Sequence, residues 1–368
     1  MHGIIFAYNT NIRLKELTEH RTVSSIPFGG RYRVIDFMLS NMVNSGILDV
    51  GVIMRENYQS LLDHLGSGKD WDLSRKRGGL WLLPPFGLTN SKGESGYRGK
   101  MDALSHVMAY IQHVRYPYVV LADGDLVTNI DLNPVLAHHK ETGADITAVC
   151  TPKHIGLPQE STYLTFGRGG FVTDVVISPA KPEGCETLGI YIMETSMLEK
   201  LVSYCATRNL FSFEVDVLQK MAGTLKVSGF IHHAYASRMQ STAAYFHESM
   251  QLLKGEVRDA LFVPERTVRT KVRDEASSYY SPTARVGNCI VADGCYIEGD
   301  VENSVLFRGV TVEKGARVEN SILMQDTRVC GGAHLNYAIT DKNVVINEAR
   351  MMMGHASYPI AIAKDTVV

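Results

Sequence analysis

The chain has 368 residues, which is more than one ordinary domain and close to the length of two. Its hydrophobic content of 45%, charged content of 21% and net charge of −2 are typical of a soluble globular protein. A nucleic-acid-binding protein would carry a basic surplus, which this chain lacks. No apolar run approaches the roughly 18 residues of a membrane span, and the N-terminus has no basic, cleavable leader. We therefore expect a cytoplasmic protein without nucleic-acid or membrane partners.

Short, nearly all-apolar runs alternate with helical patterns over residues 1–256. The runs that predict strands are 3–8, 50–54, 118–125 and 145–150. Helices are predicted for 36–46, which ends at Gly46, and for 102–114, with Asp102 as a candidate N-cap. Strands that are apolar on both sides belong to sheets covered by helices on both faces. The alternation therefore predicts an α/β, Rossmann-like domain with a mostly parallel sheet.

The polar loop after the first predicted strand contains no glycine. The stretch 4–18, IIFAYNTNIRLKELT, has the layout of a buried strand that leads into a phosphate loop and then into Arg13 and Leu14. Yet no glycine occurs between Gly3 and Gly29. Only glycine lets several backbone N–H groups crowd against phosphates at unusual backbone angles. We therefore do not expect this loop to hold a triphosphate.

A different period begins near the C-terminal end of the chain. The stretch 257–280 has mixed charges and no clean period, which predicts a linker on the surface. Over 281–368, apolar residues recur every six positions, as in Leu306, Val312 and Val318. This period fits neither a helix nor a flat strand, and it predicts a left-handed parallel β-helix of hexapeptide repeats. The other residues with this spacing are Val291 and Ile297; Leu323, Val329 and Leu335; and Ile339 and Val345.

Several motifs, taken in order, resemble one enzyme family. They are IPFGGRYRVIDFMLSNMVNSGI (26–47), YRGKMDAL (97–104), LADGDL (121–126), AKP (180–182) and LGIYIM (188–193). Together with the six-residue repeat, they resemble the bacterial ADP-glucose pyrophosphorylases, or glucose-1-phosphate adenylyltransferases, over nearly the whole chain. The resemblance implies a nucleotidyltransferase domain joined to a left-handed β-helix. It also implies a reaction in which ATP and glucose 1-phosphate give ADP-glucose and pyrophosphate for glycogen synthesis.

The chain departs from that family where the chemistry is most demanding. In-line attack on the α-phosphorus of ATP spreads negative charge, so the site needs backbone N–H groups, cations and Mg²⁺ held by carboxylates. Tyr8, Asn9 and Asn11 align with the glycines of the family's loop, and Thr10 aligns with its arginine. Val23 aligns with the family's lysine, and Arg238 aligns with its second metal-binding aspartate. A cation at a metal-ligand position repels Mg²⁺. We therefore expect no catalytic residues and no cofactor in this chain.

Other family positions are retained as remnants. Arg13 matches an arginine of the phosphate loop, and Lys181 matches the sugar-phosphate lysine, although the neighbouring carboxylate is replaced by Ala180. Asp125 matches the first metal-binding aspartate. Because its partner position holds Arg238, we expect Asp125 to be a non-functional remnant of the metal site. A direct ion pair between Asp125 and Arg238 would satisfy the pocket without metal.

Basic residues at three positions match those with which the family binds phosphorylated activators between its two domains. They are Arg21, Arg33 and Lys342, the last in the stretch TDKNV. Guanidinium groups suit bidentate binding of phosphate, so a phosphosugar effector is an expected ligand. The alternative is that Arg31 and Arg33 pair with nearby carboxylates such as Asp36.

These losses favour a regulatory, catalytically deficient subunit. In some Firmicutes-type bacteria of the family, a catalytic subunit pairs with a shorter and nearly inactive homologue. The resemblance implies that role for this chain, in a hetero-oligomer, expected to be a tetramer, whose catalytic glucose-1-phosphate adenylyltransferase subunit holds Mg²⁺. One alternative is an active sugar-phosphate nucleotidyltransferase with an atypical phosphate loop. Others are a phosphosugar-binding module without a partner enzyme, and an acyltransferase, which would need His334 as its base.

Overall fold

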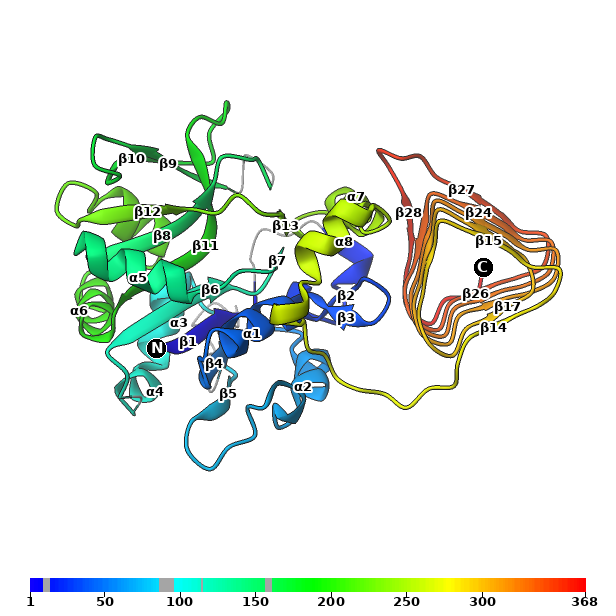
Figure 1. The fold of residues 1–368 in the computed structure, drawn as a ribbon, viewed down its shortest axis with the longest axis horizontal. Helices are drawn as coiled ribbons and strands as arrows, with labels where there is room; N and C mark the ends of the chain where they lie inside the picture. Colours follow the sequence, from blue (N-terminus) through cyan, green and yellow to red (C-terminus); the bar gives the residue numbers. More distant parts are fainter. Residues whose placement is uncertain (9–13, 86–95, 114, 156–160) are drawn as a thin grey trace.

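The computed structural model describes residues 1–8, 14–85, 96–113, 115–155 and 161–368. An α/β domain and a triangular coil of short strands lie side by side and are joined by a long connection (Figure 1). Within the described ranges, no helix is long and apolar enough to cross a membrane. The predicted order, an α/β domain followed by a β-helix, is confirmed.

A nine-stranded mixed sheet forms the centre of the α/β domain. β1 lies between β4 and β6, and β5 lies outside β4, with all four strands parallel. β11 runs antiparallel to β6 and β8 and lies between them. The strands predicted for 118–125 and 145–150, which are β6 and β8, are therefore not neighbours in the sheet. The strands of this sheet are β1 His2–Phe6, β4 Asp49–Ile53, β5 Gly79–Leu83, β6 Tyr118–Asp123, β8 Ile146–Thr151, β9 Thr162–Phe166, β10 Val172–Ile177, β11 Cys185–Glu194 and β12 Val227–Ile231. Two further pairs are β2 Pro27–Phe28 with β3 Tyr32–Arg33, and β7 Leu126–Thr128 with β13 Ala236–Arg238.

Helices cover both faces of this sheet. The α-helices are α1 Val34–Asn44, α2 Gln59–Leu65, α3 Lys100–His106, α4 Met108–His113, α5 Asn133–Thr142, α6 Thr195–Ala206, α7 Thr242–Gln251 and α8 Gly255–Leu261. Shorter turns are the 3₁₀ helices η1 Lys15–Leu17, η2 Val23–Ser25, η3 Lys69–Trp71 and η6 Pro264–Arg266, and the π-helix η5 Phe213–Gln219. Side chains of α3, α4 and α6 pack on one face, and those of α1, α2 and α5 pack on the other. The all-apolar strands predicted from the sequence are buried for this reason.

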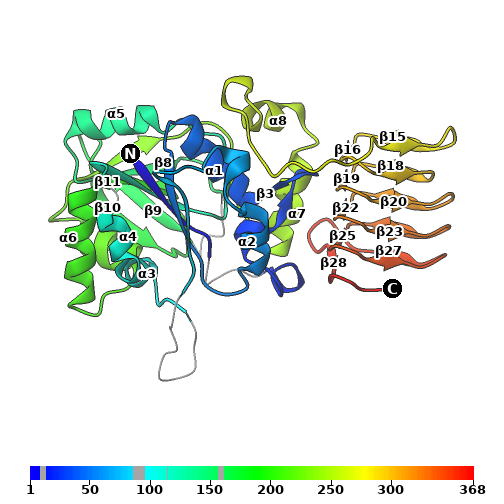
Figure 2. The same ribbon diagram turned by 90° about the horizontal axis from the view of Figure 1, so that it is seen from below.

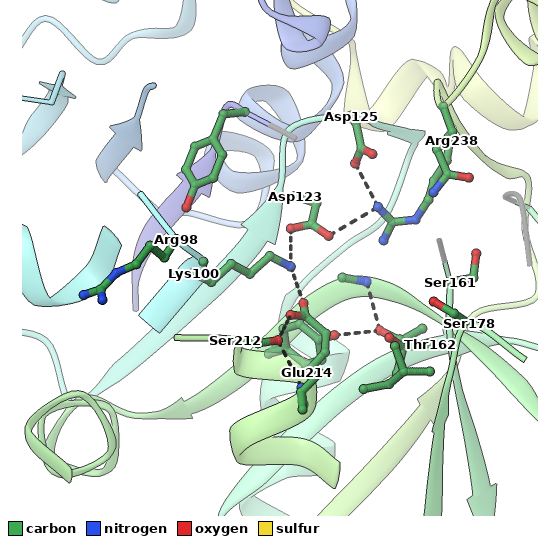
Figure 3. Close-up of a pocket in the computed structure, with 18 residues that line it drawn as sticks. Arg98, Lys100, Asp123, Asp125, Ser161, Thr162, Ser178, Ser212, Glu214 and Arg238 are labelled. Carbon is green, nitrogen blue, oxygen red and sulfur yellow. Dashed lines mark hydrogen bonds and ion pairs between the residues drawn. The ribbon is translucent and has the colours of Figure 1, made fainter. Parts of the chain in front are cut away.

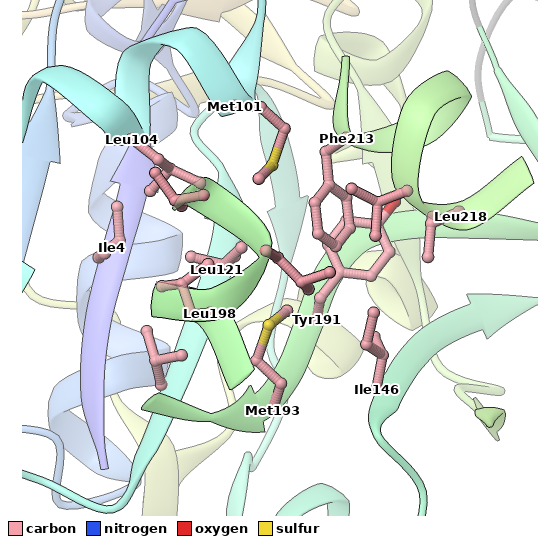
Figure 4. Close-up of a cluster of buried hydrophobic side chains, with 14 of the residues drawn as sticks. Ile4, Met101, Leu104, Leu121, Ile146, Tyr191, Met193, Leu198, Phe213 and Leu218 are labelled. Atoms are coloured by element: carbon pink, nitrogen blue, oxygen red, sulfur yellow. The ribbon is translucent and has the colours of Figure 1, made fainter. Parts of the chain in front are cut away.

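The face beneath α3 and α6 shows how this packing is built. Leu104 of α3 and Leu198 of α6 meet Ile4 of β1 and Leu121 of β6 in one buried cluster (Figure 4). Met101, Ile146, Tyr191, Met193, Phe213 and Leu218 extend the cluster toward η5 (Figure 4). Removal of this apolar surface from water is the main force that holds the domain together.

The helix predicted for 102–114 differs from the structure at its start and in its middle. It begins at Lys100 and is interrupted at Val107, which separates α3 from α4. Asp102 is therefore not the N-cap. Its carboxylate lies in the first turn and accepts a hydrogen bond from the backbone N–H of Arg98. The helix predicted for 36–46 is α1, and the backbone turns at Gly46, whose φ is +78°.

Three parallel five-stranded sheets form the sides of the triangular coil, whose turns stack on one another in Figure 2. One side contains β14 Tyr279–Tyr280, β17 Tyr296–Ile297, β20 Thr311–Val312, β23 Arg328–Val329 and β26 Val345–Ile346. The second contains β15 Arg285–Gly287, β18 Asp300–Glu302, β21 Arg317–Glu319, β24 His334–Asn336 and β27 Met351–Met353. The third contains β16 Ile290–Val291, β19 Val305–Leu306, β22 Ile322–Leu323, β25 Ala338–Thr340 and β28 Ile360–Ile362. The predicted left-handed parallel β-helix of hexapeptide repeats is confirmed.

One part of the predicted repeat is wrong by one residue. Thr340 and Ile346, rather than Ile339 and Val345, pair with the inward-facing residues of the preceding coil. Ile339 is buried, but it packs against the α/β domain from outside the coil. Ile339 was therefore mistaken for an inward-facing residue, because a side chain buried by a second domain is apolar in the same way as one buried inside the coil.

The linker predicted for 257–280 is wrong at both of its ends. α8 occupies 255–261, where Val257 and Leu261, four residues apart, are buried. The pattern was hidden by charged residues on the exposed face of this short, seven-residue amphipathic helix. At the other end, Tyr279 and Tyr280 already form β14, the first strand of the coil. The extended connection covers only residues 267–278.

The α/β domain packs against the third side of the coil. Val305, Ile322 and Ile339 of successive coils join an apolar cluster with Phe28 and Phe37 of the α/β domain. A buried ion pair reinforces this contact, because the guanidinium of Arg21 lies 2.9 Å from the carboxylate of Asp341. The two side chains are only 4% and 2% exposed. The domains therefore form one body with a substantial shared core.

Candidate functional site

A polar pocket of about 310 Å³ lies at the carboxyl end of β6, beside β11 and η5 (Figure 3). Ligand sites of open α/β sheets form at this edge, where successive strands end. Its lining residues are Tyr8, Arg98, Gly99, Lys100, Asp123, Asp125, Ser161, Thr162, Ile177, Ser178, Thr187, Gly189, Tyr191, Ser212, Glu214, Val215, Arg238 and Gln240.

Arg238 of β13 extends into this pocket and contacts two carboxylates. Its Nη1 lies 2.8 Å from Asp125 Oδ1 and 3.2 Å from Asp123 Oδ2 (Figure 3). The predicted ion pair between Asp125 and Arg238 is therefore present. Burial alone would lower the pKa of Arg238, but Asp125 and then Asp123 raise it above its usual value. The guanidinium is thus permanently charged in the pocket.

The close approach of these groups requires a glycine on the neighbouring strand. Gly189 lies at a register shift of β11 with φ at +69°. A Cβ atom at this position would lie 2.1 Å from Asp123 Oδ2 and 2.6 Å from Arg238 Nη2. A larger residue would displace both groups, so the backbone of β11 is shaped around the ion pair.

A second cation, Lys100, lies on the other side of Asp123. Its Nζ is 2.6 Å from Asp123 Oδ1 and 2.5 Å from Glu214 Oε1 (Figure 3). Burial opposes the charge of Lys100, but Asp123 and Glu214 outweigh it and raise the pKa well above its ordinary value. We call Lys100, Asp123, Asp125, Glu214 and Arg238 the ion-pair cluster. It contains three carboxylates and two cations, so its net charge is −1.

Sequence reasoning missed three members of the cluster. Lys100 lies within the motif YRGKMDAL, and Asp123 precedes Asp125 by two residues at the end of a strand, so both carried a signal that could have been used. Glu214 lies on the π-helix η5, far from the other members in the sequence. No local pattern connects it with them.

The residues of the ion-pair cluster do not fit a divalent metal ion. Mg²⁺ and related ions need several oxygen ligands directed at one point. The Arg238 guanidinium occupies the space between the carboxylates of Asp123 and Asp125. Over the ranges that the structure describes, no group of three or more His, Cys, Asp or Glu side chains is arranged to hold a metal.

The predicted degenerate loop is described only in part. Asn9, Thr10, Asn11 and Arg13 lie outside the described residues. Tyr8 lines the pocket, where its ring lies 5.8 Å from the ring of Tyr97. Burial raises the pKa of its hydroxyl, which stays protonated. A phenol ring thus lies where a loop glycine would leave backbone N–H groups accessible.

The other predicted remnants lie away from the ion-pair cluster. Val23 of η2 is buried in the apolar cluster between the domains, so the family's lysine is replaced by a core residue. Lys181 is exposed on the connection between β10 and β11. Among the described residues that line the pocket, the nearest in sequence to Lys181 is Ser178.

A second, strongly basic cavity lies between the two domains. We call it the cationic cleft; it has a volume of about 80 Å³ and is lined by Arg31, Tyr32, Arg33, Asp63, His64, Lys271, Arg273, Arg308, Gln325 and Lys342. Its cations come from the α/β domain, from the connection and from the β-helix. Among the described residues, six cationic side chains therefore share the cleft with one lining carboxylate, that of Asp63.

Two of the three predicted effector residues line this cleft. These are Arg33 and Lys342, whereas Arg21 is not among the lining residues and is paired with Asp341. The alternative pairing of Arg33 with Asp36 takes another form. Asp36 accepts a hydrogen bond from the backbone N–H of Arg33, while the Arg33 guanidinium donates to the carbonyl oxygen of Ser60 at 2.6 Å.

The cleft contains polar atoms that the protein leaves unused. Arg308 is only 6% exposed, yet its Nε has no hydrogen-bond partner in the part of the chain that the structure describes. The same holds for Gln325 Oε1. Buried polar groups without partners are unusual in folded proteins and call for an explanation. Sequence reasoning missed Lys271 and Arg273, which lie in the connection without a recognisable motif, and Arg308, which lies between the apolar positions of the six-residue repeat.

Comparison with known proteins gives the class of this chain. The pattern of the nucleotidyl transferase family matches residues 2–235, and that of the GlmU-like C-terminal hexapeptide matches residues 274–357. The chain belongs to the nucleotidyl transferase family, in the group formed by the GlgD proteins and the glucose-1-phosphate adenylyltransferases.

Within that group, the chain is similar to two proteins named glycogen biosynthesis protein GlgD. It is 34% identical to that of Bacillus subtilis over 368 residues, which cover 100% of this chain and 96% of the relative. It is 37% identical to that of Geobacillus stearothermophilus over 321 residues, or 86% and 82% of the two chains. The glucose-1-phosphate adenylyltransferase of Bacillus cereus is 29% identical over 358 residues, or 95% and 94%. The family predicted from the motifs is confirmed.

Proposed function

We propose that this chain is a regulatory, catalytically deficient subunit of a glucose-1-phosphate adenylyltransferase that acts in glycogen biosynthesis in the cytoplasm. One observation carries the proposal: Arg238 forms ion pairs with Asp123 and Asp125, the carboxylates best placed for a metal. Transfer of a nucleotidyl group needs a divalent ion to neutralise the developing charge. In the proposed complex, the catalytic homologue supplies Mg²⁺ and the chemistry, and this chain has no cofactor of its own.

The alternative of an active nucleotidyltransferase has less support. It would require Mg²⁺ to displace a guanidinium that two carboxylates hold, and a tyrosine to replace a glycine beside the phosphates. An acyltransferase would need a free histidine base. His334 is bonded to Glu319 at 2.9 Å on the outer face of the coil, so its Nε2 is already engaged by a carboxylate.

The first prediction concerns the chain alone. We expect negligible formation of ADP-glucose from ATP and glucose 1-phosphate, because the ion-pair cluster excludes the metal. A pyrophosphate-release assay with Mg²⁺ measures this directly. Turnover of about 1 s⁻¹ or more, within the ordinary range of enzymes, would establish the alternative of an active enzyme. An adenylyltransferase of the catalytic type serves as the positive control in the same assay.

The proposed assembly requires a surface for a partner, and the first coil of the β-helix offers one. Tyr280 and Val286 are 47% and 39% exposed, whereas the residues stacked on them in the next coil, Ile297 and Val301, are buried. Within the part of the chain that the structure describes, β14, β15 and β16 pair with another strand on one side only. Apolar side chains beside unpaired strand edges favour association.

The second prediction follows from this surface. We expect homo-oligomers of the chain alone and a mixed tetramer when it is co-expressed with the catalytic homologue of the same organism. Native mass spectrometry at micromolar concentration reports the composition. Val286→Asp should weaken assembly, because it places a charge on the open coil, while Val176→Asp on the exposed side of β10 should not. Only separate species in the wild-type sample would refute the proposed partnership.

The cationic cleft gives the proposed subunit a means of regulation. We propose that it binds an anionic effector, and a phosphosugar is the expected class. Six cations around a small cavity, with the buried Arg308 lacking a full set of partners among the described residues, favour a ligand with phosphate oxygens. A subunit without chemistry changes its partner's activity only by favouring one of the partner's conformations. An effector bound between two domains is well placed to do this.

A further inference from the structure

We propose that an anion entering the cationic cleft binds together with a proton, and that Lys342 carries this proton. Occupancy of the cleft then depends on pH as well as on the anion. The inference rests on the proposed role of the cleft as an anion site and concerns how that site is regulated. Three sets of observations support it: the crowding of cations, the environment of Lys342, and the way the neighbouring charges are held.

The first observation is the arrangement of like charges. Arg31, Arg33, Lys271, Arg273 and Arg308 line the same cavity of about 80 Å³ as Lys342. Like charges in a confined space with restricted water repel one another, and the group that loses its proton most easily relieves this repulsion. Arginine stays protonated in proteins, whereas lysine releases its proton readily when buried. Of the six cations, Lys271 and Lys342 are therefore the candidates.

The two lysines differ in their surroundings. Lys271 donates a hydrogen bond to the backbone carbonyl oxygen of Asp63 at 2.6 Å. Burial and then the nearby Arg33 and Arg21 lower the pKa of Lys342 to about 7 against the opposing attraction of Asp341. At neutral pH, the empty cleft thus holds Lys342 with and without its proton in similar amounts.

Two titratable groups near Lys342 are already engaged by other partners. Asp341 forms the ion pair with Arg21. In α2, His64 is bonded to Asp36 at 2.6 Å, and burial lowers the pKa of His64. Besides Lys271, the other groups that line the cleft are Arg31, Tyr32 and Arg33 of the α/β domain, Asp63 of α2, Arg273 of the connection, and Arg308 and Gln325 of the β-helix. Among the lining cations, Arg308 also has a lowered pKa, caused first by burial, but an arginine remains charged at neutral pH.

Proton uptake then follows from linkage. A bound dianion favours the charged form of Lys342, so its pKa is higher in the complex than in the empty cleft. Binding is strongest below the pKa of the empty state and weakens as pH rises above about 7. The affinity for the anion falls by up to about tenfold per pH unit, until the pH exceeds the pKa of Lys342 in the complex.

Isothermal titration calorimetry with inorganic sulfate tests this, because sulfate does not titrate near neutral pH. Titrations in two buffers with different heats of protonation give the number of protons taken up. With the full-length wild-type chain we expect about half a proton per sulfate near pH 7, and affinity that falls at higher pH. Lys342→Arg keeps the charge at every pH, so it should bind sulfate without proton uptake and without pH dependence.

Two further variants complete the design. Arg33→Ala should weaken sulfate binding, and because Arg33 helps to lower the pKa of Lys342, proton uptake should shift to higher pH and not disappear. Lys314→Arg, on the outer face of the coil, should behave as wild type. Sulfate binding without proton uptake would overturn the inference and leave the anion site standing. Proton uptake that persists in Lys342→Arg would assign the proton to another group, such as His64. No sulfate binding at any pH would overturn both the inference and the anion site.

Discussion

Replacement of Arg238 by alanine is expected to destabilise the α/β domain by about 3–5 kcal/mol, the usual cost of leaving a buried charge without its partner. Asp123 and Asp125 would lose the guanidinium that lies between them. The ion-pair cluster would keep three carboxylates and one cation, Lys100, and its net charge would change from −1 to −2. The apparent melting temperature should fall by on the order of 10 °C.

The same variant should gain sensitivity to divalent ions. With the guanidinium removed, Asp123 and Asp125 present oxygen atoms to a shared space, as a Mg²⁺ or Mn²⁺ site requires. Millimolar Mg²⁺ should therefore raise the melting temperature of Arg238→Ala, because any ligand that binds the folded state alone stabilises it. The wild-type chain should show little response, since Arg238 already neutralises these carboxylates.

Two controls separate this effect from a general loss of stability. Arg238→Lys keeps a cation in the pocket, so it should lose less stability than alanine and stay insensitive to Mg²⁺. Arg208→Ala removes an exposed arginine of the same domain and should change little. Thermal melting with and without Mg²⁺ measures all four proteins. Equal Mg²⁺ responses in wild type and Arg238→Ala would show that Arg238 does not exclude the metal.

The second large effect is expected at the domain interface. Arg21→Ala leaves the carboxylate of Asp341 buried without its partner, at a cost of about 3–5 kcal/mol. The domains should separate more readily, and hydrogen exchange should increase in β25 and in the segment around Arg21. Chemical denaturation, followed together with hydrogen-exchange mass spectrometry, distinguishes this local opening from unfolding of either domain.

A double-mutant cycle isolates the pair itself. Arg21→Met combined with Asp341→Leu removes both charges and should be much less destabilising than either single change, because no buried charge remains unpaired. Arg328→Ala serves as the control, since it breaks an exposed pair with Glu313 on the outer face of the coil. Additive effects of the two single changes would mean that Arg21 and Asp341 do not act as a unit.

The sequence was sufficient to predict the architecture, because each part has its own periodicity. Apolar runs and helical patterns predicted the α/β domain, and the six-residue repeat predicted the β-helix. The errors occurred where a second element buries a residue. Ile339 followed the repeat but packs on the α/β domain, and Val257 and Leu261 form a buried turn within a stretch that was predicted to be a linker. Burial by a distant segment is invisible to a local pattern.

The candidate site was predictable to the extent that its residues lie in aligned motifs. The pair of Asp125 and Arg238 followed from a carboxylate retained at one metal position and a cation gained at the other. Glu214 could not be inferred, because only the fold brings η5 to the end of β6. Arg21 was predicted as an effector ligand, but its buried partner Asp341 lies 320 residues further along the chain. The sequence shows which residues are charged, but it does not show which of them form ion pairs in the folded chain.

The attachment of the α/β domain to the side of the coil has a consequence for the tolerance of insertions. Successive partners on that side, Ile290, Val305, Ile322, Ile339 and Ala361, are separated by 15, 17, 17 and 22 residues. The last turn therefore accepts an extra loop while its strands stay paired. Extra residues at a corner, or a whole additional turn beyond β28, would leave the shared core in place. A single deletion between Val305 and Ile339 would instead rotate inward-facing and domain-facing residues into each other's positions. Chain length can thus vary in this protein where register cannot.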